Sequence, residues 1–88
     1  MLDKVKTALR INNSSFDEEI KSLISACKKD LELAGIEPSK IIITDNMIVQ
    51  AIILYCKANF GFDNPESERF SKAYESMKSL LSLCASYS

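Results

Sequence analysis

The feature that most constrains this fold is an apolar stretch at residues 45–62, DNMIVQAIILYCKANFGF. Its apolar side chains occupy nearly every side of a helical wheel, and a helix that is apolar all round is a buried one. The run is too long for a strand, although its β-branched residues would suit one. We therefore predict a central helix at about 45–60, capped by Thr44 or Asp45 and stopped at Gly61, which takes a left-handed conformation at no steric cost.

A membrane-spanning helix is the rival interpretation of this stretch, and its length argues against it. A span needs about 20 largely uncharged residues, whereas this run is shorter and contains Gln50 and Lys57. The whole chain has 88 residues, which make one small domain, residues 1–88. A domain of this size buries only about 60 to 65% of the surface of its unfolded chain, so we expect apolar surface to remain for neighbouring copies to cover.

Two further helices are predicted before the central one, because apolar residues recur there at spacings of three and four. The first, at about 2–10, is so short that it must dock on its own core or on an adjacent subunit. The second, at about 16–34, is expected to be capped by Ser14 or Ser15, with capping-box spacing between Ser15 and Glu18. Gly35 ends this second helix.

The last helix is predicted at about 65–84, with Asn64 as its cap and Pro65 at the first helical position. The residues after it form a short tail that we expect to fray. The predicted fold is all-α, a small bundle of three long antiparallel helices and one short N-terminal helix. The buried seam of the last helix is expected to contain Phe70, Ala73, Tyr74, Met77, Leu80, Leu81 and Cys84.

The segment at residues 36–44, IEPSKIIIT, is the least helical part of the chain. Pro38 favours an extended Glu37, and the β-branched triplet at residues 41–43 suits a short extended segment. Successive residues of an extended chain point to opposite sides. At least one isoleucine is therefore exposed or meets another chain, and the open alternative is a plain hydrophobic lead-in to the central helix.

Charge and cysteine content exclude several classes of site. Eleven Lys and Arg stand against twelve Asp and Glu, so the basic excess typical of proteins that grip phosphate is missing. Cys27, Cys56 and Cys84 each lie in an apolar helical pattern, without a CxxC pair, and the chain has no histidine. We expect three buried free thiols in a reducing cytoplasm, and no disulfide, metal or cofactor. The first ten residues lack the apolar run of a signal peptide.

Catalysis is not expected from this inventory of side chains. The chain has no histidine and two glycines, both assigned to helix ends, and no cysteine or serine stands beside a recognisable base. A helix-turn-helix DNA reader is a more serious rival. However, the turn before the last helix leads into Glu66 and Glu68, and an acidic first turn is unfavourable near phosphates. The residues alone thus indicate an all-α interaction module that self-associates.

Two blocks of the sequence resemble a known family. Residues 1–36 open MLDKVKTALRI and continue FDEEIKSLISACKKDLELAGI, and residues 51–83 read AIILYCKANFGFDNPESERFSKAYESMKSLLSL. Together they resemble the head-tail connector proteins of tailed bacteriophages, which are also described as DNA-packaging or head-completion proteins. The most specific part is AIILYCKANFG, followed by the N-P-E turn and by Phe70 and Tyr74 at F-x-x-x-Y spacing.

The resemblance implies a structural virion protein without catalytic activity, assembled in the host cytoplasm and located at the head-tail junction. Such proteins form a ring of about a dozen copies between the portal protein and the tail or next head-completion protein. The ring extends the channel for DNA packaging and ejection, and DNA passes without sequence-specific binding. A small helical DNA-binding regulator of prophage origin is the alternative, and an enzyme subunit or inhibitor is a third possibility.

The candidate contact residues follow from the amphipathic pattern, since the family supplies no functional residue to carry over. We expect subunit or partner contacts at Leu2, Val5, Leu9, Ile41, Ile42 and Ile43. The candidate polar contacts are Lys4, Lys6 and Arg10. Three basic residues are also commonplace on a solvated helix face, so a purely structural role for them stays open.

Overall fold

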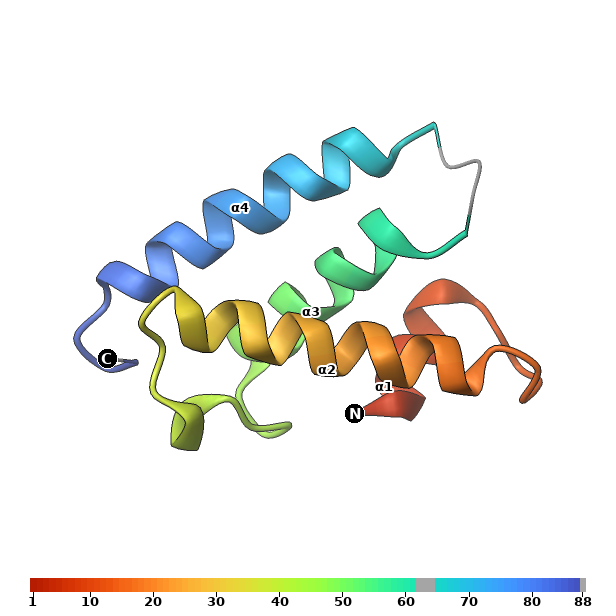
Figure 1. Ribbon diagram of the computed structural model, residues 1–88, viewed down its shortest axis with the longest axis horizontal. Helices are drawn as coiled ribbons and strands as arrows, with labels where there is room; N and C mark the ends of the chain where they lie inside the picture. The colour runs from red at the N-terminus through yellow and green to blue at the C-terminus, as the bar shows by residue number, and fades with distance from the viewer. Residues whose placement is uncertain (62–64, 88) are drawn as a thin grey trace.

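The computed structural model describes residues 1–61 and 65–87, which form four α-helices and one 3-10 turn without any strand (Figure 1). The predicted all-α fold is confirmed, and each long helix differs from its predicted bounds by one or two residues at each end. The elements are α1 (Leu2–Leu9), α2 (Asp17–Leu33), η1 (Pro38–Lys40), α3 (Asn46–Asn59) and α4 (Ser67–Leu83).

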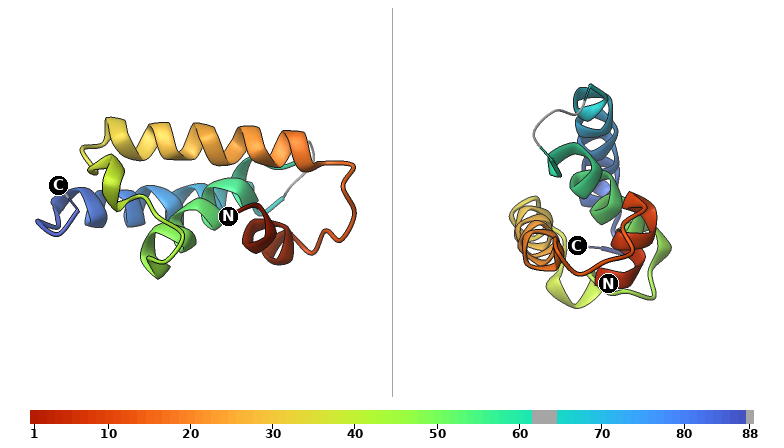
Figure 2. Two further views of the ribbon diagram at one scale, coloured as in Figure 1. Left: turned by 90° about the horizontal axis from the view of Figure 1, so that it is seen from below. Right: turned by 90° about the vertical axis from the view of Figure 1, so that its right-hand side faces the viewer.

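Helix α3 lies at the centre of the bundle, as its apolar sequence predicts. It packs against α1, α2 and α4, and the end-on view in Figure 2 shows it between α4 on one side and α1 and α2 on the other. Helices α2 and α4 run in the same direction, opposite to α3, and diverge towards their N-terminal ends (Figure 1). The buried core consists of Val5, Ile20, Ile24, Cys27, Leu31, Ile36, Ile48, Ala51, Ile52, Cys56, Tyr74 and Leu81.

The ends of α3 follow the predicted local chemistry. Asp45 is the N-cap residue, and its Oδ1 atom accepts hydrogen bonds from the backbone amides of Met47 at 2.9 Å and Ile48 at 3.3 Å. Two otherwise unpaired amides at the start of the helix are thereby satisfied. After the helix, Gly61 adopts a φ of +86°, as a left-handed stop requires.

Helices α1 and α2 end in the same hydrogen-bonded motif. At the end of α2, Gly35 has a φ of +104°, and the amide of buried Ile36 donates to a carbonyl five residues back at 3.1 Å. At the end of α1, Arg10 takes the left-handed position with a φ of +61°, and the amide of Ile11 donates back in the same way at 2.9 Å. This motif satisfies carbonyls in the last turn of each helix.

The predicted cap of α2 is wrong. No side chain caps this helix, and Phe16 occupies the N-cap position. The amide of Ser15 instead donates to the Oδ1 atom of Asn13 at 3.0 Å, within the preceding turn. The Phe16 ring packs edge-to-face against Phe60, with 5.4 Å between ring centroids. The start of α2 therefore has a ring contact with the end of α3, and the expected capping box is not formed.

The predicted start of α4 is also displaced. The helix begins at Ser67 with Glu66 as its N-cap residue, so Pro65 precedes the helix. Asn64, the predicted cap, lies outside the described residues. The buried seam of α4 is narrower than expected, because Leu80 is 67% exposed. Cys84 is exposed as well, so buried thiols are found at two of the three cysteines.

The linker and the tail pack against each other, which the sequence did not predict. Glu37 is extended as expected, and residues 38–40, for which no element was predicted, form a 3-10 turn. The tail does not fray at Tyr87, whose backbone oxygen accepts from the Glu37 amide at 2.6 Å. The Tyr87 hydroxyl donates to the Oδ1 atom of Asp45 at 3.1 Å. The tail thus braces the linker and the start of α3.

Candidate functional site

The candidate sites of this molecule are one polar cluster and several exposed apolar surfaces. Across residues 1–61 and 65–87, no cluster of three His, Cys, Asp or Glu side chains is placed to hold a metal ion. Within the same residues, no helix is both long enough and apolar enough to cross a membrane.

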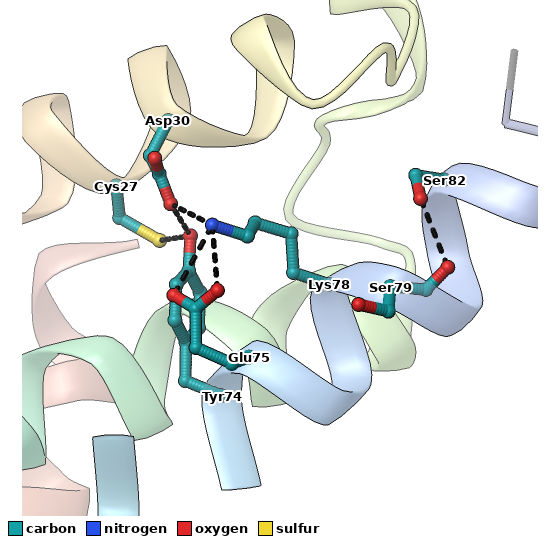
Figure 3. A network of polar contacts seen from close by, with 7 residues as sticks. All are labelled: Cys27, Asp30, Tyr74, Glu75, Lys78, Ser79 and Ser82. Carbon is teal, nitrogen blue, oxygen red and sulfur yellow. Dashed lines mark hydrogen bonds and ion pairs between the residues drawn. The ribbon is translucent and has the colours of Figure 1, made fainter. Parts of the chain in front are cut away.

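A polar cluster connects α4 to α2 where the two helices approach each other (Figure 3). The Tyr74 hydroxyl donates to the Oδ2 atom of Asp30 at 2.6 Å. The Lys78 ammonium lies 3.0 Å from the same oxygen and 3.0 Å from Glu75. The Cys27 thiol lies 3.7 Å from the Tyr74 hydroxyl. We refer to Asp30, Tyr74 and Lys78 as the α2–α4 clamp.

The protonation states of the clamp suit a structural role. Partial burial opposes ionisation of Asp30, yet the hydrogen bonds from Tyr74 and Lys78 outweigh it and lower the pKa of the carboxyl group. Burial and the bond to Asp30 raise the pKa of Tyr74. Burial also raises the pKa of the Cys27 thiol to about 12. A thiol held neutral in this way is a poor nucleophile, and the bonds of Asp30 to Tyr74 and Lys78 fasten α2 to α4.

The predicted apolar contacts on α1 divide into two groups. Val5 is 0% exposed and belongs to the core of its own chain. In this fold Val5 cannot contact another copy, which corrects the prediction for that residue. Leu2 and Leu9 are half-buried and pack against the core. Each therefore leaves only part of its side chain for a partner.

The predicted polar contacts on α1 divide in a similar way. Lys4 and Arg10 are exposed, so both remain open to a partner. The ammonium of Lys6 instead lies 2.8 Å from Asp17 Oδ1, with the two side chains 16% and 25% exposed. Lys6 consequently ties α1 to the start of α2.

The isoleucine triplet behaves as the pattern predicts for consecutive residues. Ile41 is half-buried against the core, whereas Ile42 and Ile43 are 46% and 42% exposed. The expectation that at least one of the three is exposed is confirmed. Met47, in the first turn of α3, is 46% exposed. We refer to Ile42, Ile43 and Met47 as the linker patch.

Sequence reasoning missed the most exposed apolar residues. Leu83 is 85% exposed, Leu33 at the end of α2 is 78% exposed, and Leu80 is 67% exposed. Ser76, Leu80 and Leu83 are exposed at spacings of four and three, so they lie along one outer face of α4. One signal could have identified this face, because residues 79–88 contain no charged side chain. We refer to Ser76, Leu80 and Leu83 as the α4 ridge.

An apolar groove lies between the N-terminal half of α2 and the C-terminal end of α3. Its volume is about 590 Å³, and the ring pair of Phe16 and Phe60 forms part of its wall. Sequence reasoning did not identify it, because its two sides lie about 40 residues apart in the chain. We refer to it as the α2–α3 groove, and its lining residues are Phe16, Glu19, Ser22, Leu23, Asn59, Phe60 and Gly61.

Comparison with known protein families matches residues 1–88 to the family described as phage connector protein. Searches of curated proteins and of solved structures find no match for the chain. The family match covers α1 to α4, and with them the clamp, the linker patch, the α4 ridge and the α2–α3 groove.

Proposed function

Because this chain belongs to the phage connector protein family over residues 1–88, it is a structural phage protein, and we propose that it forms an oligomeric ring at the head-tail junction. The ring lies between the portal protein and the tail or next head-completion protein, and it extends the channel through which DNA is packaged and ejected. Membership of the family over the whole chain is the observation that carries this proposal.

Exposed apolar surface supports assembly as the mode of action. Single exposed apolar residues are normal on a soluble protein, but clusters of them mark interaction sites. The linker patch contributes three large apolar side chains, each more than 40% exposed, within six residues of the sequence. We assign the linker patch to contacts with a neighbouring copy or with the portal protein.

The surface charge suits passage of DNA without retention. The chain has a formal net charge of −1, and several lysines are engaged by carboxylates, including Lys6, Lys72 and Lys78. A channel rich in free basic groups would bind the duplex through counterion release and would slow its movement. The proposed ring instead presents a balanced surface, so that DNA slides through it.

Genetic removal of the protein from its phage tests this function. We expect particles that lack the chain to package DNA but to remain without tails, and plasmid-encoded wild-type protein to restore tailed particles. Electron microscopy of purified particles provides the measurement, and antibody labelling should place the protein at the head-tail junction. Normal numbers of tailed particles without the chain, or absence of the chain from purified particles, would refute the proposal.

Binding to duplex DNA separates this function from that of a DNA-binding regulator. A regulator that contacts phosphates loses affinity steeply as the salt concentration rises. For a connector, we expect no salt-sensitive binding of a short duplex in a fluorescence anisotropy titration. Tight binding at about 50 mM salt that weakens by orders of magnitude at about 200 mM would favour the regulator.

A further inference from the structure

An apolar projection and an apolar recess lie at opposite ends of this molecule. The α4 ridge occupies the C-terminal half of α4, near the end of α2. The α2–α3 groove lies at the other end, where α2 begins and α3 finishes. The two surfaces thus face different neighbours when copies are placed side by side.

We propose that the α4 ridge of one copy docks in the α2–α3 groove of the next copy, as the repeating contact of the ring. This inference rests on the proposed function, because it identifies the surfaces through which the ring would close. A ring of identical copies needs two different surfaces on each copy, since a contact between identical surfaces stops at a dimer. The ridge and the groove supply such a pair.

The ridge has the side-chain spacing of a helix that docks in a groove. Ser76, Leu80 and Leu83 stand at positions i, i+4 and i+7 and are all exposed. Helices that bind in hydrophobic grooves use anchors at this spacing. The small Ser76 side chain lets the helix approach closely, while the two leucines supply the apolar surface that docking would bury.

The groove has the size and character to receive two leucine side chains. Its volume of about 590 Å³ falls within the ~300 to 1,000 Å³ of pockets that enclose a small ligand. Phe16, Leu23 and Phe60 give it apolar walls, and Phe16 itself is 44% exposed. A leucine that enters would gain about 25 cal/mol for each Å² of apolar surface removed from water.

Charge favours the same pairing. No charged residue occurs from Ser79 onwards, so docking of this end buries no charge from the ridge. Among the described residues that line the groove, Glu19 is the one ionisable side chain, and it is exposed to water. The contact therefore avoids the cost of burying an unpaired charge.

Cysteine crosslinking tests this contact, because Cys84 follows Leu83 directly and is exposed. Ser22→Cys places a second thiol in the groove lining, at an exposed position. Mild oxidation of the full-length variant, both in concentrated solution and in phage particles, should join Cys84 of one copy to the introduced thiol of the next. We expect a ladder of multimers beyond the dimer on a non-reducing gel.

Three matched variants sharpen the result. Adding Cys84→Ser to the Ser22→Cys variant should abolish the ladder. Adding Leu80→Asp and Leu83→Asp should reduce multimers beyond the dimer at least about tenfold, as loss of central anchors does at other interfaces. Ser25→Asp, which adds a charge on an exposed face of α2 outside the groove lining, should leave the ladder unchanged. Labelling with a maleimide checks that Cys84 is equally reactive in every variant that retains it.

Three outcomes would overturn the contact. The first is crosslinking that stops at dimers, and the second is a ladder that persists when Leu80→Asp and Leu83→Asp are both present. The third is the absence of any crosslink, both in solution and in particles. Dimers alone would indicate a symmetric contact between two ridges. If the protein is found at the head-tail junction without such a ladder, the proposed function stands and this contact falls. If the protein forms the ladder in solution but is absent from particles, the contact stands and the proposed function falls.

Discussion

Helices α3 and α4 pack against each other, yet they relate to the solvent in opposite ways. Helix α3 has 14 residues, and its buried side chains include Ile48, Ile52 and Cys56. Helix α4 has 17 residues, of which only Tyr74 and Leu81 are buried. The fold therefore depends on α3, whereas α4 attaches by one narrow face and leaves its outer face available for assembly.

The α2–α4 clamp gives α4 a second attachment besides its packing against α3. Tyr74 and Lys78 both bond to Asp30 across the gap between the helices. Hydrogen bonds to a charged partner contribute about 1.5 to 3 kcal/mol each, more than bonds between neutral groups. A directional contact of this kind also fixes the rotation of α4, and hence the direction in which its leucines point.

The largest effect on stability is expected from a substitution that creates a cavity beside α3. Ile52 is 0% exposed, so Ile52→Ala should lower the free energy of unfolding by about 3 kcal/mol, measured by urea titration followed with circular dichroism. Leu83→Ala is the matched control on α4, where an 85% exposed side chain should change stability by less than about 0.5 kcal/mol. Similar losses for both variants would remove the distinction between the two helices.

The second largest effect is expected from alkaline pH, which should lower the free energy of unfolding through two buried thiols on α2 and α3. Burial raises the pKa of the thiols of Cys27 and Cys56 from 9.0 to about 12 and about 11. The pKa of each thiol is higher in the folded state than in the unfolded state, so burial of the neutral thiols contributes to stability. This contribution is complete below about pH 9 and is lost as the pH rises towards 11 to 12. At pH 10 we expect a loss of about 1 kcal/mol for each thiol.

Urea titrations at pH 7.5, 9 and 10, with a reducing agent present, measure this loss. Cys56→Ala supplies the control, because without that buried thiol about half of the pH-dependent loss should disappear. A stability that is constant up to pH 10 would show that the two thiols are accessible to water in the folded protein.

The clamp should contribute less than the core, and its loss should act on α4 in particular. Asp30→Ala removes the acceptor shared by Tyr74 and Lys78 and should cost about 2 kcal/mol. Glu75→Ala is the control, since this carboxylate is more exposed than that of Asp30 and bonds to Lys78, so its removal should cost less than about 0.5 kcal/mol. Amide hydrogen exchange should then show faster opening of α4 than of α3. Equal acceleration in both helices would mean that α4 is not separately fastened.

The smallest effect on stability is expected in the linker patch. Ile42 is 46% exposed, so Ile42→Asp should change the free energy of unfolding by less than about 0.5 kcal/mol and leave a folded helical monomer. The same variant should fail to restore tailed particles if the linker patch is an interface. A loss of helicity in circular dichroism would instead place this side chain in the core.

Local signals in the sequence predicted the helices and most of their ends. The apolar periodicity predicted the four helices, and Asp45, Gly35 and Gly61 act within a few residues of their own positions. Contacts between distant residues were not predictable in this way. The Tyr87 bonds to Asp45 and Glu37 join segments more than 40 residues apart. No local sequence pattern near Tyr87 predicts these two hydrogen bonds.

The candidate site was predicted only where exposure follows from local geometry. Three consecutive isoleucines cannot all face one core, so exposure in the linker patch was foreseeable. Val5 was misassigned because an amphipathic helix shows which side is apolar and does not show what covers it. Leu80 was misassigned because its spacing of three from Met77 fits the apolar seam, whereas in the fold it lies on the outer face of α4 with Ser76 and Leu83.

One carboxylate oxygen links the tail to the central helix. The Oδ1 atom of Asp45 accepts from the amides of Met47 and Ile48 and from the hydroxyl of Tyr87. These two amides are consequently natural reporters, because undocking of the tail changes the shared acceptor. Their chemical shifts in a nuclear magnetic resonance spectrum should record the position of the tail without any label attached to it.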